Sequence, residues 1–304
     1  IFPYLEAMAG QAMGMVIGKG GADTATNALV RMIEAHGGAV ETGADVTGIT
    51  HSGGKVTGVT VDGGRIRAQT VLAGLAPRHL LRLTGGTGDA RFDTGLKTFR
   101  HAPGTMMLHL ALDKPVPWQA EPLRRFAYVH IGRSLDVAAR TYAQAMAGLL
   151  PAEPLLVVGQ PTLFDPTRAP EGKHTLWVQL RMVPAEIKGD AAGEITATDW
   201  TGALAPMTER ALALIEEQAP GFRDTILGQH AVSPLDLEAG NPNLVGGDQI
   251  CGSHHISQNF LFRPLRGFAD GHTPIAGLHL IGAAAWPGAG TGAGSGYFTA
   301  QALG

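Results

Sequence analysis

The sequence predicts an α/β protein in which a discontinuous α/β domain is interrupted by an inserted α+β lobe. Three observations predict this fold class. The two ends of the chain combine short β-prone runs with helical patterns, whereas the middle shows well-separated strands without regular strand–helix alternation. Glycine is densest toward the two ends, at 14–21, 53–64, 246–252 and 282–296. The 304 residues also suffice for two lobes.

Composition narrows the class of protein. Hydrophobic residues make up 44% of the chain and charged residues 16%, which predicts a globular fold. A formal net charge of −3 gives no basic footprint for nucleic acid. The single cysteine, Cys251, excludes an internal disulfide and predicts a reducing compartment, which favours the cytoplasm. No uninterrupted apolar run is long enough for a membrane helix, and the first twelve residues do not resemble a secretory signal.

The first part, 1–84, predicts a helix followed by short strands. Apolar residues recur at helical spacing, and Gly37 and Gly38 end that pattern. The run Asp62-Gly63-Gly64 joins two β-prone segments, which is a strong hairpin signal because the turn needs positive φ. The predicted helices are 23–36 and 77–83, and the predicted extended segments are 39–42, 45–50, 55–61, 65–70 and 71–73.

The middle part, 85–240, is predicted to be a substrate lobe built on an antiparallel sheet covered by helices. Its predicted strands are 105–111, 126–131, 155–159 and 174–183, and its predicted helices are 135–149 and 199–218. The last part, 241–304, is predicted to complete the domain begun by 1–84.

The end of the chain predicts a strand, a glycine loop and a helix start. Strand 278–281 leads into 282–290, and a helix is expected from Thr291 to Ala302. Free backbone amides at a helix start favour anionic or electron-rich ligand groups. Alternating glycines at 288, 290, 292 and 294 leave room for a flat ring. A glycine-rich surface loop without a ligand fits the same pattern.

Two groups of motifs resemble the phytoene desaturase (phytoene dehydrogenase-related) family of FAD-dependent oxidoreductases and its amine-oxidase-like relatives. The early motif contains Gly20-Gly21, Gly38 and Thr42-Gly43-Ala44-Asp45-Val46. The late motif contains Gly246-Gly247-Asp248, Gln258, Arg263-Pro264, Thr273-Pro274-Ile275, Gly277-Leu278, Gly282 and Pro287-Gly288-Ala289-Gly290. The resemblance implies an FAD-binding Rossmann-like domain of the amine-oxidase/glutathione-reductase type, plus an antiparallel-sheet substrate domain.

The resemblance also implies the activity and the cofactor contacts. Family members move hydride or electrons between FAD and an apolar organic substrate, in desaturase, dehydrogenase or saturase reactions, often at membrane surfaces. Peripheral membrane contact is therefore an expectation. The implied FAD contacts are Val46, at the adenine, and Gly282, Ala283, Trp286, Gly290, Thr291 and Gly292, near the flavin. Many relatives have an acidic residue where this sequence has Ala283.

One family motif has no counterpart here. No G-x-G-x-x-G turn lies between a strand and a helix in the 304 residues, although that turn holds the pyrophosphate. We therefore expect a truncated, carboxyl-terminal portion of a family member, with an incomplete FAD-binding domain and weak or no FAD binding by this chain alone. Uncovered apolar faces would favour self-association. The alternative is a non-catalytic remnant or partner-binding module that keeps the fold without the cofactor.

Other sites are less well supported, and the sequence identifies no catalytic residue. A serine hydrolase would use Ser295 or Ser253 with His254 and His255, but Ala293 replaces the first glycine of a G-x-S-x-G elbow. No histidine spacing predicts a metal site. The two histidines fit either a substrate cavity or an ordinary loop. Cys251 fits a buried apolar position or a thiol near the flavin, and Arg263 fits a loop clamp or a phosphate contact.

Overall fold

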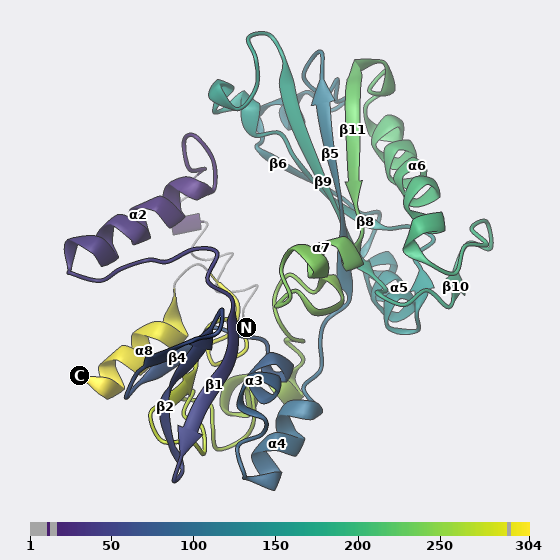
Figure 1. Ribbon diagram of the computed structural model, residues 1–304. Coiled ribbons are helices and arrows are strands. Elements are labelled where there is room, and N and C mark those ends of the chain that lie inside the picture. Colours follow the sequence, from purple (N-terminus) through teal and green to yellow (C-terminus); the bar gives the residue numbers. More distant parts are fainter. Residues whose placement is uncertain (1–10, 13–16, 291–292) are drawn as a thin grey trace.

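The computed structural model describes residues 11–12, 17–290 and 293–304, which form two lobes around separate hydrophobic cores (Figure 1). The first core draws on two separate segments, 46–99 and 245–284. The second core draws on 106–231 alone. The fold is mixed α/β with antiparallel sheets, which confirms the predicted class. Phe92 and Leu96, which belong to the range predicted for the substrate lobe, pack in the first core.

The first lobe contains an antiparallel sheet in the order β1-β2-β3. The strands are β1 (Val46–Ser52), β2 (Lys55–Val61) and β3 (Gly64–Arg67). Asp62 and Gly63 adopt positive φ values of 38° and 79° at the tight turn, so the predicted hairpin is confirmed. The expected extended segment 39–42 is wrong, because it is exposed, irregular backbone with no partner strand.

A two-stranded parallel sheet brings the distant ends of the first lobe together. Strand β4 (Val71–Ala73) pairs with β12 (Leu278–Leu280), with Val71 opposite Leu278 and Ala73 opposite Leu280. Helices α3 (Pro77–Thr84) and α4 (Ala90–Lys97) pack beside it through Leu80 and Phe92. Helix α8 (Gly294–Leu303) follows the glycine loop after β12. The glycine loop therefore starts directly after a strand, β12, that is buried in the first core.

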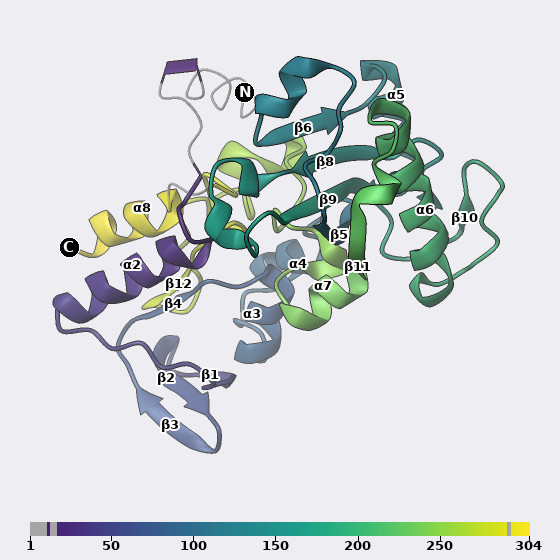
Figure 2. The same ribbon diagram turned by 90° about the horizontal axis from the view of Figure 1, so that it is seen from above.

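The second lobe is a five-stranded antiparallel sheet in the order β11-β5-β9-β8-β6. The strands are β5 (Gly104–Leu112), β6 (Tyr128–Ile131), β8 (Leu155–Gly159), β9 (His174–Val183) and β11 (Ile226–Val232), with β7 (Leu149–Leu150) pairing separately with β10 (Gly189–Asp190). Helices α5 (Leu135–Met146) and α6 (Trp200–Gln218) and the short α7 (Pro234–Gly240) complete the lobe (Figure 2). Alternate residues of β5 and β9 join α6 in the core, which leaves the other sheet face open.

Helix α2 (Asp23–Ala35) has no buried residue, and it exposes Leu29, Met32 and Ile33. The segment before it is attached to the second lobe, where the Gly20 amide donates to Asp165 Oδ2 at 2.7 Å. In Figure 1, α2 stands apart from both sheets. No helix in the described part of the chain is long and apolar enough to span a bilayer.

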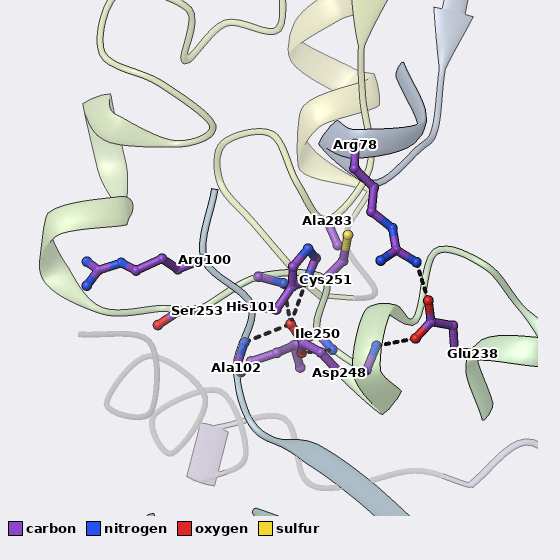
Figure 3. Close-up of polar contacts among 12 residues, drawn as sticks. Arg78, Arg100, His101, Ala102, Glu238, Asp248, Ile250, Cys251, Ser253 and Ala283 are labelled. Carbon is purple, nitrogen blue, oxygen red and sulfur yellow. Dashed lines mark hydrogen bonds and ion pairs between the residues drawn. The ribbon is translucent and has the colours of Figure 1, made fainter. Parts of the chain in front are cut away.

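The chain enters the second lobe at 101–102 and returns to the first lobe at 248–252, and the buried carboxylate of Asp248 joins these two crossings. Its Oδ2 accepts from the Ala102 amide at 2.9 Å, the Gly252 amide at 2.7 Å and His101 Nδ1 at 3.2 Å. Its Oδ1 accepts from the Ile250 amide at 3.1 Å. Figure 3 shows the carboxylate between these segments. Residues 101–102 lead into β5, and 248–252 return to the first lobe, so one side chain fixes both.

A second set of polar contacts joins α3 to the returning segment. Arg78 on α3 pairs with Glu238 on α7, and Glu238 Oε2 also accepts from the Gly246 amide at 2.6 Å (Figure 3). Asn243 Oδ1 accepts from the Ala76 amide at 2.8 Å. These contacts hold α7 of the second lobe against the first lobe.

Hydrogen bonding decides the charge state of Asp248. Burial by itself would raise the pKa of this carboxyl group, but His101 and the Ala102, Gly252 and Ile250 amides donate to the ionised form. Their combined effect holds the pKa of Asp248 below its ordinary value. The carboxylate is therefore charged and fully bonded at neutral pH.

Asp248→Asn should lower the free energy of unfolding by about 3 kcal/mol, because the amide nitrogen cannot accept and so leaves a buried backbone donor unpaired. Urea unfolding followed by circular dichroism measures the difference. Asp62→Asn is the control, since Asp62 is exposed in the hairpin turn, and we expect it to change stability by less than about 0.5 kcal/mol. Equal effects of the two substitutions would contradict the role of Asp248.

The stabilisation by Asp248 should depend on pH. A folded-state pKa below the ordinary value means that the unfolded chain takes up the proton first. The contribution is then complete above about pH 4, the ordinary value of the group, and declines as the pH falls toward the folded-state pKa. Urea titrations from pH 7 to pH 3 should show the gap between wild type and Asp248→Asn narrowing below about pH 4. A constant difference in unfolding free energy from pH 7 to pH 3 would show that the charge of Asp248 does not contribute to stability.

Candidate functional site

The glycine loop 282–290 begins where β12 ends, and its first residue is fixed by α8. The Gly282 amide donates to Ser295 Oγ at 2.8 Å, and the same hydroxyl donates to the Gly282 carbonyl at 3.2 Å. The side-chain position of Gly282 faces Gly74 Cα at 3.8 Å, at the end of β4. The loop therefore starts at the carboxyl ends of the two parallel strands, where ligands bind in open α/β sheets.

Further along the loop, Gly288 and Gly290 differ in their surroundings. At Gly290 an added Cβ would meet no atom within 4 Å among the described residues other than its chain neighbours. At Gly288, which has a φ of +101°, an added Cβ would lie 2.9 Å from His254 Cε1 and 3.2 Å from Arg263 Nε. Trp286 packs on Phe260, with ring centroids 5.0 Å apart. One side of the loop is thus packed against 254–263, while Gly290 is open.

The structure places the predicted cofactor contacts as follows. Val46 begins β1 and Ala283 is the second residue of the glycine loop, and both pack against the first core. Thr291 and Gly292 lie outside the described residues. The predicted helix start at Thr291 therefore falls outside them as well, and in the described residues α8 begins at Gly294, after Ala293 with its left-handed φ of 50°. The assignment of these residues to a cofactor stays a prediction.

Arg263, which the sequence left open, is a clamp on backbone carbonyls. Its Nε and Nη2 donate to the Ala283 carbonyl at 2.9 and 2.6 Å. Its Nη1 donates to the Ser253 carbonyl at 3.2 Å, and Nη2 also donates to the Cys251 carbonyl at 3.0 Å. The side chain is fully buried. It therefore ties the glycine loop to the segment that carries His254 and His255.

A cavity of about 500 Å³ lies between the segment 248–255 and the ends of β5 and β9 in the large sheet. His254 and His255 both line it, so the cavity interpretation of these histidines agrees with their position. The rest of the wall consists of Ala102, Pro103, Thr105, Tyr142, Arg181, Met182, Asp248, Gln249, Ile250 and Ser253. A volume in this range suits a small organic ligand.

His254 connects the cavity with the glycine loop. It lines the cavity, and its Cε1 lies 2.9 Å from the place that a Cβ on Gly288 would occupy. Burial and the nearby Arg263 lower the pKa of His254, although Asp248 acts in the opposite direction. The imidazole is therefore neutral at physiological pH. A neutral ring can donate one hydrogen bond and accept another.

Cys251 is a buried apolar residue rather than a reactive thiol. Burial, followed by the charge of Asp248, raises the pKa of its thiol to about 11. The thiolate, which is the reactive form, is then scarce at neutral pH. Of the two roles left open by the sequence, the structure supports the packing role.

The described residues contain neither a nucleophile–base pair around the two serines nor a metal cluster. The Ser295 hydroxyl is bonded to Gly282, and the Ser253 hydroxyl accepts from the His255 amide at 3.2 Å. Across 11–12, 17–290 and 293–304, no group of three or more His, Cys, Asp or Glu side chains is arranged to hold a metal. The serine hydrolase interpretation therefore finds no support in this geometry.

The cavity wall was the part of the site that sequence reasoning missed. Thr105 and Arg181 come from paired strands β5 and β9, and Tyr142 comes from α5. Local periodicity indicates which residues alternate along a strand, but not which strand end faces a distant loop. The strand register across the sheet was needed to find these residues.

Comparison with known proteins places the chain in a family. The sequence profile of the flavin-containing amine oxidoreductases matches residues 1–203. The chain is 30% identical over 151 residues to a rat pyridine nucleotide-disulfide oxidoreductase domain-containing protein 2, covering 50% of this chain and 25% of that protein. It is 25% identical over 206 residues to a limonene dehydrogenase polypeptide of Castellaniella defragrans, covering 65% of this chain and 36% of that one.

Solved structures share the fold. An oxidoreductase from Methanosarcina mazei matches with a TM-score of 0.56 and 20% identity, over 88% of this chain and 50% of that one. A putative protoporphyrinogen oxidase from Exiguobacterium matches with a TM-score of 0.51 and 11% identity, over 90% and 49%. The chain thus spans about half the length of these structures and less of the curated relatives. The match over two thirds of its residues shows that the chain belongs to the flavin-containing amine oxidoreductase family.

Proposed function

We propose that this chain forms the flavin-facing and substrate-binding part of an FAD-dependent oxidoreductase that acts on an apolar organic substrate. The observation that carries the proposal is the position of His254, which lines the cavity and lies so close to Gly288 that an added Cβ there would be 2.9 Å from His254 Cε1. His254 thus joins the glycine loop that follows β12 to a cavity of about 500 Å³. A planar redox ring and its substrate need two such adjoining spaces.

The residues fit a flavin for reasons of shape and polarity. Gly290 leaves open space above the loop, and Trp286 is held beside it by Phe260. Gly282 and Ala283 lie at the carboxyl end of β12, and Val46 packs against the same core as Ala283. Thr291 and Gly292 complete the proposed set of contacts. FAD, when bound, supplies the two-electron chemistry, and the protein orients it.

The cavity supports an apolar substrate with a few polar groups. Ala102, Pro103, Met182 and Ile250 supply apolar wall, and the neutral His254 imidazole can orient a polar atom of the substrate at the boundary with the loop. Asp248, though it lines the cavity, is occupied by its four donors. We assign it to positioning of the wall rather than to proton transfer.

The 304 residues alone should hold FAD weakly. They contain no G-x-G-x-x-G turn, whose backbone amides bind the pyrophosphate in dinucleotide-binding folds. The loop and cavity described above would then supply ring and substrate contacts but little of the phosphate affinity. Tests of function therefore belong on the product of the complete reading frame.

A second candidate is a partner-binding module that keeps the fold without the cofactor. Exposed Leu29, Met32 and Ile33 on α2 favour it, because an exposed apolar stripe promotes association. The two candidates differ in one measurable property, the binding of FAD to the complete protein.

The product of the complete reading frame should purify with bound FAD and show the visible absorption bands of a flavin. Gly290→Val should weaken FAD binding at least about tenfold, which corresponds to 1.4 kcal/mol, because the added side chain occupies the open space above the loop. Fluorescence titration of the apoprotein with FAD measures the affinity.

Gly193→Val is the matched control, since Gly193 also has positive φ and open surroundings but lies in the second lobe, away from the loop. It should bind FAD like the wild type. Absence of flavin from the complete wild-type protein would refute the enzyme proposal and favour the partner-binding module.

A further inference from the structure

Arg263 is unusual because, among the described residues, this fully buried cation hydrogen-bonds only backbone carbonyls, with its guanidinium over the Phe99 ring, 5.7 Å from the ring centroid. Its four hydrogen bonds reach the carbonyls of Cys251, Ser253 and Ala283, which belong to two different segments. It forms no salt bridge with any acidic residue of the described chain. Buried charges are ordinarily paired with an opposite charge. The positive charge of Arg263 is instead dispersed over carbonyl dipoles.

The nearby Asp248 does not neutralise this charge directly. Its carboxylate is occupied by His101 and three backbone amides, all of which belong to the lobe crossings. Burial lowers the pKa of Arg263, whereas Cys251 and Asp248 act in the opposite direction. An arginine begins so far above neutrality that the guanidinium remains charged.

The charge lies directly under the glycine loop. Arg263 Nε is 3.2 Å from the position that a Gly288 Cβ would occupy, and its neighbour Nη2 holds the Ala283 carbonyl. A buried charge is screened less by solvent and salt than an exposed one. Its field therefore reaches the surface of the loop where the flavin ring is proposed to lie.

We propose that Arg263 is a positioning residue with two effects: it holds the glycine loop against the cavity wall, and its positive charge favours the reduced, anionic flavin over the neutral oxidised flavin. This inference rests on the proposed function. Hydride transfer breaks a substrate C–H bond and adds two electrons and one proton to the flavin, which thereby gains one negative charge. The oxidised substrate loses its remaining proton to solvent or to a base.

Two substitutions separate charge from geometry. Arg263→Lys keeps the positive charge but cannot bond all three carbonyls, and Arg263→Gln removes the charge while keeping a polar side chain. Arg100→Gln is the matched control, because Arg100 is an exposed arginine that bonds Ser257, in the segment between Ser253 and Arg263. All three are made in the complete protein with bound FAD.

The midpoint potential of the bound flavin tests the electrostatic effect. Arg263→Gln should lower the affinity for reduced relative to oxidised flavin about tenfold, which lowers the potential by about 30 mV for a two-electron couple. Arg263→Lys should retain most of the wild-type potential, and Arg100→Gln should leave it unchanged. A residue with a purely structural role would not shift the potential. An unchanged potential in Arg263→Gln would therefore overturn the electrostatic role.

Hydrogen exchange of the apoprotein tests the clamp without any flavin. Both Arg263 variants should exchange the amides of Ala285 and Gly288 at least about tenfold faster, because these amides bond within the loop that Arg263 holds. Unchanged exchange at both amides would overturn the positioning role. If the wild-type protein contained no flavin, both the proposed function and the electrostatic role would be refuted. Hydrogen exchange would still show whether Arg263 holds the glycine loop in place.

Discussion

The arrangement of the site depends on two buried charges that are stabilised mainly by hydrogen bonds to the backbone and not by an ion pair with each other. Asp248 accepts from the amides of Ala102, Ile250 and Gly252, and Arg263 donates to three carbonyls. Ionised groups form stronger hydrogen bonds than neutral ones, so each charge organises irregular backbone that no sheet or helix supports. Between the two charges lies the segment that carries His254 and His255. Its shape is set from both ends.

These two charges explain how the segment 248–255 can shape both the cavity and the glycine loop. On one side, 248–255 forms the wall of the cavity against β5 and β9. On the other side, Arg263 joins this segment to Ala283, and His254 leaves no room for a side chain at Gly288. Moving the segment would therefore change the cavity and the glycine loop together. The lobes contribute in distinct ways, because the first supplies the loop and the second supplies the sheet face.

Local sequence signals predicted the elements in which neighbouring residues decide the structure. The strand β9 was found because Leu176, Val178 and Leu180 alternate with less buried residues, and the hairpin was found because Asp62-Gly63 suits positive φ. Helix α4 was missed because it is short and contains Gly95, although Asp89 caps it through the Phe92 amide. Helix α7 was also missed, despite the capping box formed by Ser233 and Asp236.

The long-range parts of the site were beyond such signals. Glycine spacing indicated the loop after β12, but the cavity wall required the pairing of β5 with β9, and the clamp required Arg263 to meet a carbonyl twenty residues away. A crystal structure of the complete protein with FAD tests the central claim most directly. The account predicts the flavin ring against the backbone of Gly288 and Gly290, with the cavity beside it. A flavin bound elsewhere, with this loop facing solvent, would contradict it.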